Sequence, residues 1–167
     1  MDAKDILLDG FGRLPDEVRG ALHGLTAEQL RWAPVEGANT IGWLIWHLTR
    51  VQDSHLAEVL DADQVYVTGD WGPKFGLKSD PSDTGYGDSA GQISRVEPRS
   101  AQVLLDYYQA VHDRTLAYVS GLTDADLDRV VDDRWDPPVT LGVRLVSVLG
   151  DDWQHVGQAA YIRGLLD

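Results

Sequence analysis

The sequence predicts an all-α fold: a four-helix bundle with a long crossover link between its second and third helices. Two observations lead to this prediction. Apolar residues recur with helical periodicity in four separate segments. Between the second and third segments, residues 61–99 are rich in glycine and proline, which favour turns. A chain of 167 residues suits one domain, so we expect a single domain over residues 1–167.

The first two helices are predicted from their apolar stripes. We expect the first over residues 3–23 and the second over residues 40–60. The stripe of the first consists of Ile6, Leu7, Phe11, Leu14, Val18 and Leu22. The stripe of the second consists of Ile41, Leu44, Ile45, Leu48, Gln52, His55, Leu56 and Val59. One apolar side on each helix is what packing against neighbouring helices requires.

The link over residues 61–99 is long enough to cross the bundle, so the helices it joins need not be antiparallel neighbours. It contains Trp71, Phe75, Leu77 and Tyr86, which indicate a packed and ordered loop. Long loops in compact domains are often functional. We therefore expect Trp71, Phe75 and Tyr86 to cover a bound substrate.

The third and fourth helices are expected over residues 101–120 and 141–166. The stripe of the third consists of Leu104, Leu105, Tyr108, Val111, Thr115 and Val119. The stripe of the fourth consists of Leu145, Val148, Leu149, His155, Val156, Ala159, Ile162 and Leu166. A histidine among these apolar positions is a first sign of chemistry in the core.

Composition excludes several classes of protein. The chain has no cysteine, which excludes disulfides, thiolate metal sites and a thiol nucleophile of its own. Its net charge of −13 argues against binding nucleic acid or an anionic membrane through a positive field. No segment has the length of apolar sequence that a membrane helix needs, and the first residues do not form a signal peptide. We expect a soluble, cytoplasmic protein.

One local pattern could bind a metal ion. Asp151 and His155 are four residues apart, so both side chains lie on one face of the fourth helix. A carboxylate and an imidazole at this spacing can bind one divalent ion. His47 flanks the stripe of the second helix and is the candidate third ligand. The alternative is an ordinary ion pair between Asp151 and His155.

Three further charged residues lie near these positions. Asp152 falls near the centre of the fourth stripe, where it is either a hydrogen-bond partner for the site or the ligand in place of Asp151. Arg144 either holds an anionic substrate group or neutralises nearby acids. Arg50 could orient the substrate in the same way. For His55 we expect a satisfied core histidine.

Three stretches resemble a known family. Residues 38–53 resemble the second helix of the DinB/YfiT-like superfamily, and residues 134–164 resemble its fourth. Residues 71–77 and 83–87 are similar to its actinobacterial branch, that of the mycothiol S-transferases, which is related to the N-terminal domain of mycothiol-dependent maleylpyruvate isomerase. The resemblance covers essentially the whole chain.

The resemblance implies a bundle that binds one divalent metal ion, often zinc or nickel. The family ligands then correspond to His47, Asp151 and His155, with Asp151 where the isomerase branch has a glutamate. Homodimers are implied as well, as in many members.

The resulting hypothesis is a metal-dependent transferase that activates a low-molecular-weight thiol, such as mycothiol, for attack on an electrophile. Because the chain has no cysteine, the thiol must arrive as a co-substrate. Two alternatives remain open: a non-catalytic metal- or ligand-binding dimer, and a metal-dependent hydrolase.

Overall fold

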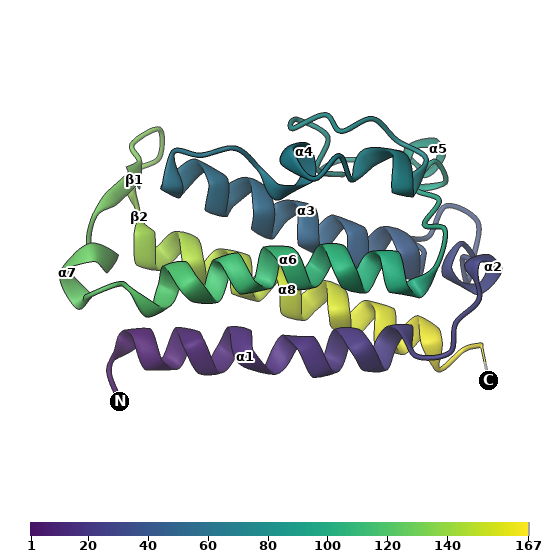
Figure 1. Cartoon of the computed structure of the whole chain (residues 1–167), viewed down its shortest axis with the longest axis horizontal. Coiled ribbons are helices and arrows are strands. Elements are labelled where there is room, and N and C mark those ends of the chain that lie inside the picture. The colour runs from purple at the N-terminus through teal and green to yellow at the C-terminus, as the bar shows by residue number, and fades with distance from the viewer. Residues whose placement is uncertain (167) are drawn as a thin grey trace.

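Helices make up most of the computed structural model, which describes residues 1–166. The four long helices are α1 (Ala3–Leu22), α3 (Ile41–Leu60), α6 (Ala101–Ser120) and α8 (Leu141–Arg163). They run alongside one another over the length of the molecule (Figure 1), with α3 and α1 each packed against α8 and α6. The predicted helical fold is confirmed. The fourth helix ends at Arg163, three residues before the predicted end at Leu166.

Side-chain caps fix where all four long helices begin, and Asp2 caps α1 by accepting from the backbone N–H of Asp5. The Thr40 hydroxyl accepts a hydrogen bond from the backbone N–H of Trp43, and α3 begins at the next residue. Ser100 caps α6 and Thr140 caps α8 in the same way. Such caps satisfy one of the backbone donors that a helix leaves free at its start.

The link over residues 61–99 is more regular than its composition indicates. It contains α4 (Val65–Thr68), a 3₁₀ helix η1 (Gly72–Phe75) and α5 (Ala90–Ile93). Gly76, in the left-handed conformation, ends η1. The remaining short helices are α2 (Ala27–Leu30) and α7 (Asp124–Leu127). The glycine and proline residues of the link therefore keep its helices to about one turn each, but they do not prevent these helices from forming.

A small antiparallel sheet was not part of the all-α prediction. Strand β1 (Val130–Asp132) pairs with β2 (Val139–Thr140), with Val130 opposite Thr140. Branched side chains at Val130, Val131 and Val139 suit extended backbone. The sheet lies at the end of the molecule where α8 begins (Figure 1), and it brings Asp132 next to that helix.

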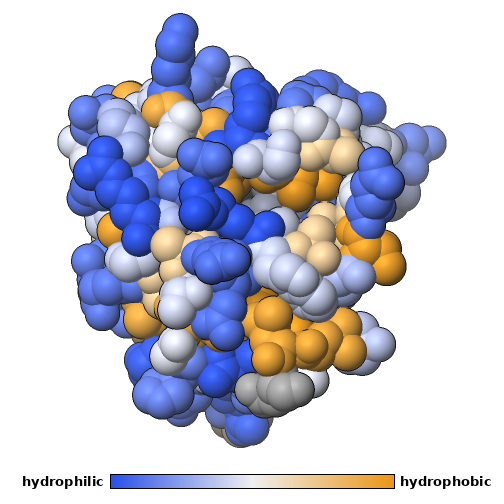
Figure 2. Space-filling model, turned by 90° about the vertical axis from the view of Figure 1, so that its right-hand side faces the viewer, coloured by the Kyte–Doolittle hydropathy of each residue, from blue (hydrophilic) through white to orange (hydrophobic). Residues whose placement is uncertain are grey.

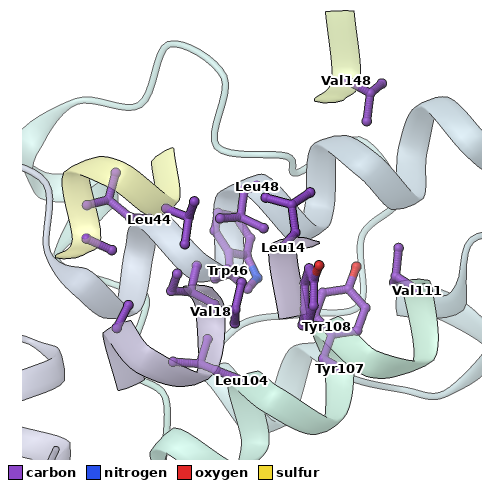
Figure 3. Packing of buried hydrophobic residues seen from close by; sticks show 14 of the residues in the cluster. Leu14, Val18, Leu44, Trp46, Leu48, Leu104, Tyr107, Tyr108, Val111 and Val148 are labelled. Carbon is purple, nitrogen blue, oxygen red and sulfur yellow. The ribbon is translucent and has the colours of Figure 1, made fainter. Parts of the chain in front are cut away.

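The core lies between the long helices. Figure 3 shows Leu14 and Val18 of α1, with Trp46 and Leu48 of α3, facing side chains of α6. Trp46 of α3 and Tyr107 of α6 are fully buried, and Tyr108 of α6 is almost fully buried. Because α3 is buried along almost its whole first half, polar residues on that stretch are held inside the protein.

The face of the molecule drawn in Figure 2 is mainly hydrophilic. Figure 2 shows separate apolar patches among hydrophilic side chains at the end of the molecule that carries α2 and α5. Among residues 1–166, no helix combines the length and the apolar character needed to cross a bilayer.

Candidate metal centre

Three of the predicted ligands lie together between α3 and α8. His47 comes from α3, and Asp151 and His155 come from α8. One potential ligand atom from each residue lies within 4.8 Å of the others. The two imidazole rings meet edge to face with centroids 4.8 Å apart, and His155 Nε2 is 3.4 Å from Asp151 Oδ1. We call these three residues the His–Asp–His cluster.

His47 is held by contacts far away in the sequence. Its side chain is only 4% exposed, and its Nδ1 lies 2.6 Å from the carbonyl oxygen of Thr84. A carbonyl can only accept, so Nδ1 carries the proton and Nε2 is left with its lone pair. The ring stacks on Trp43 at 4.5 Å, and the Trp43 indole N–H donates to Asp88.

Gly85 allows the link to approach this closely. Its φ of +83° lies in the left-handed region, which favours glycine. A Cβ here would stand 2.8 Å from Trp46 Cζ3 and 2.9 Å from His47 Nδ1. The position therefore needs glycine for its conformation and for the space beside the histidine.

Arg50 binds the same part of the link through hydrogen bonds. It is fully buried and donates to the carbonyl oxygens of Pro81 (3.1 Å) and Asp83 (2.9 Å) and to Gln64 Oε1 (2.8 Å). Its guanidinium also lies 3.5 Å from the buried Asp53 carboxylate. These donors are occupied within the chain, so the structure gives Arg50 a role in placing the link and not in orienting a substrate.

His155 is held by neighbours on its own helix. Its Nδ1 lies 3.1 Å from Gln158 Oε1, which leaves Nε2 to face the cluster. The hydrogen bond with Asp151 raises the pKa of His155 above its ordinary value. Burial lowers the pKa of His47.

The donor set fits a divalent metal ion. Asp151 Oδ2 is buried and has no hydrogen-bond partner among residues 1–166. A buried carboxylate oxygen without a partner is costly, and a bound cation would satisfy it. Two imidazole nitrogens and one carboxylate oxygen are ligands that zinc and nickel accept, and three protein ligands leave a coordination position open.

Asp152 and Arg144 do not belong to the His–Asp–His cluster. Asp152 is fully buried, and both of its carboxylate oxygens lack a partner among residues 1–166. Burial raises its pKa well above the usual range. Asp151, and not Asp152, is the carboxylate that lies with the histidines. Arg144 pairs with Glu58 (2.6 Å) and Asp132 (3.3 Å), so it neutralises acids of its own chain.

The three aromatic residues expected over the site have different positions. Phe75 is fully buried and packs against Tyr107, and Trp71 contacts the same tyrosine at 5.2 Å. Both side chains pack against α6 through Tyr107, so neither is free to cover a substrate. Tyr86 is 92% exposed and lines a pocket that also contains Asp151.

Thr84, Gly85 and Gln158 belong to the site but were not predicted as site residues from the sequence. Thr84 acts through its backbone carbonyl, which any residue supplies, so its identity carries no signal. Gly85 and Gly87 flank Tyr86, and this closely spaced pair of glycines could have indicated a constrained turn. Gln158 follows His155 by three residues, a spacing that places it on the same helical face.

Comparisons with known proteins identify the fold and the family. A crystal structure of a conserved protein from Enterococcus faecalis is similar with a TM-score of 0.89 and 27% identity, covering 98% of this chain and 96% of that chain. The search of curated proteins gave no match. A family model of the DinB superfamily, whose members usually bind a divalent metal ion, matches residues 11–159. Because this match spans most of its length, the chain belongs to the DinB superfamily.

Proposed function

We propose that this chain is a DinB-type four-helix bundle of the mycothiol S-transferase-like branch. It binds one divalent metal ion, zinc or nickel, and transfers a low-molecular-weight thiol to an electrophile. The observation that supports this most strongly is the His–Asp–His cluster. It has two imidazoles with their Nδ1 atoms already engaged and a buried carboxylate oxygen that lacks a partner in the part of the chain that the structure describes.

Different residues of the chain have different roles at this site. His47, Asp151 and His155 would hold the ion, which when bound supplies Lewis acidity that favours the thiolate form of a thiol near neutral pH. Thr84 and Gln158 orient the two imidazoles through their Nδ1 atoms. Trp43, stacked on His47, excludes water from one side of the cluster.

Because the chain has no cysteine, any thiol that reacts at this site must be diffusible. With no thiol among the 167 residues, thiol chemistry here depends on a co-substrate. A pocket of about 440 Å³ beside the cluster has room for the reactants, and Asp151 lies in its wall. A cavity of this size is typical of small-molecule sites.

The metal site is tested by metal analysis of the purified protein and its variants. We expect about one ion per chain in the wild type, and loss of that ion in His47→Ala, Asp151→Ala and His155→Ala. His23→Ala is the matched control, because His23 is an exposed histidine outside the cluster. Retention of stoichiometric metal in all three ligand variants would rule out the site.

The activity is tested separately by thiol consumption. The metal-loaded protein, supplied with mycothiol and a haloalkyl electrophile, should consume thiol, and the metal-free protein should not. If the metal is bound but no thiol in a panel is consumed, the transferase proposal fails while the metal site stands.

A further inference from the structure

The pocket beside the cluster also contains a histidine that is not one of the ligands. The pocket lies between α3 and α8, and Thr84 and Tyr86 of the link form part of its wall. Asp151 lies in its wall, and so does His55. His55 follows His47 by two turns of α3, a rise of about 12 Å. The pocket therefore extends from the cluster toward His55.

The proton on His55 has a defined position. Arg144 Nη1 lies 2.8 Å from His55 Nδ1. A guanidinium has donors only, so Nδ1 must accept, and the neutral ring then carries its proton on Nε2. Burial and the nearby Arg144 charge lower the pKa of His55, which favours this neutral form.

The Nε2–H group of His55 is free to donate. Within residues 1–166 it has no hydrogen-bond partner, and it is not among the buried polar atoms that lack one. The side chain is 40% exposed, and it lines the pocket. With Nδ1 tied to Arg144, Nε2 is the edge of the ring that a pocket ligand can reach.

The carboxylates near this donor have cationic partners. Arg144 is only 9% exposed and pairs with Glu58 and Asp132, and Asp132 also pairs with Arg134 at 2.8 Å. Asp151 would be a ligand of the metal ion. What His55 offers a pocket ligand is therefore one N–H donor, which suits an oxygen acceptor such as a carbonyl group.

We propose that His55 is a substrate-binding residue that donates a hydrogen bond to an oxygen acceptor of the electrophile, such as a ketone, ester or amide carbonyl. This substrate class rests on the proposed transferase function. Arg144 acts through His55: it fixes the tautomer and leaves recognition of the substrate to Nε2–H.

The test is a binding experiment with two unreactive probes of similar shape on the zinc-loaded protein: acetophenone and ethylbenzene. In His55→Leu, the affinity for acetophenone should fall about tenfold, the loss expected for one hydrogen bond. The affinity for ethylbenzene should not change. In His55→Gln, the amide oxygen can accept from Arg144 and the amide N–H can donate, so acetophenone affinity should largely return.

Several outcomes would overturn the proposal. One is an unchanged affinity of His55→Leu for acetophenone, and another is an equal loss of affinity for ethylbenzene. Nitrogen NMR of the free protein gives a second readout, because a His55 ring protonated on Nδ1 instead of Nε2 would also refute it. None of these measurements requires thiol turnover, so they can succeed or fail independently of the transferase assay. Zinc content equal to that of the wild type shows that the variants keep the cluster.

Discussion

The two histidines of the His–Asp–His cluster are held in opposite ways. His47 is buried, and its Nδ1 donates to Thr84, a residue 37 positions away in the long link. His155 is partly exposed, and within residues 1–166 its hydrogen-bonding partners are Asp151 and Gln158 on its own helix. One ligand depends on tertiary structure, and the other is positioned by the local geometry of α8.

This difference indicates where the site is vulnerable. A side chain held by neighbours on its own helix keeps its orientation as long as the helix forms. His47 additionally requires that the link return to α3 and stay there. Arg50 and Gly85 make that return possible, the first by binding the link's carbonyl groups and the second by leaving room beside the ring.

Replacing Arg50 should have the largest effect. Arg50→Met leaves the buried Asp53 without its cationic neighbour and the carbonyl groups of Pro81 and Asp83 without their donor. We expect a loss of about 3–5 kcal/mol in the free energy of unfolding, because one partner of a buried charged network is removed. Urea unfolding of the metal-free protein measures it.

Arg13→Met is the matched control for this change. Arg13 pairs with Asp9 on the exposed side of α1, where ion pairs contribute little. If the two variants were equally stable, Arg50 would not be what holds the link, and the contrast between the two histidines would lose its main support.

Replacing Gly85 should affect metal binding more than folding. In Gly85→Ala, the new Cβ meets Trp46 and the His47 Nδ1 atom, so the ring must move from its Thr84 acceptor. We expect metal affinity to fall about 10–100-fold, as for loss of a partner that orients a ligand. Competition with a chromophoric chelator gives the affinity.

Gly87→Ala separates the two causes of this loss. Gly87 has a similar positive φ of +77°, but a Cβ there would have no neighbour within 4 Å among the described residues 1–166. The control variant should share the backbone strain and keep the metal affinity. Equal loss in both glycine variants would attribute the effect to strain alone and not to the contact with His47.

The same contrast explains what could be predicted from the sequence. The long helices and the Asp151–His155 pair follow from periodicity and spacing within one segment. The position of Thr84 against His47 could not be predicted, because it depends on the path of a link whose contacts are made by backbone carbonyls. Arg50 could be identified as a charge near the site, but its burial under the link is a tertiary property.

The smallest expected effect is a difference in proton affinity between the two ligands in the metal-free protein. Burial lowers the pKa of His47, so its neutral form stabilises the fold above the ordinary histidine pKa, and this contribution is lost as the pH falls through the folded value. The hydrogen bond with Asp151 raises the pKa of His155. Its protonated form stabilises the fold at low pH, and that contribution is lost as the pH rises through the folded value.

Proton NMR of the imidazole rings can resolve the two titrations. His155 should titrate at a higher pH than His47, so an interval exists near the ordinary histidine pKa in which His155 is charged and His47 is neutral. Asp151→Asn should lower the pKa of His155 more than that of His47, because Asp151 is the main cause of the shift only for His155. The reverse order of titration would mean that the exposed ligand is the more desolvated one, contrary to the burial of His47 under the link.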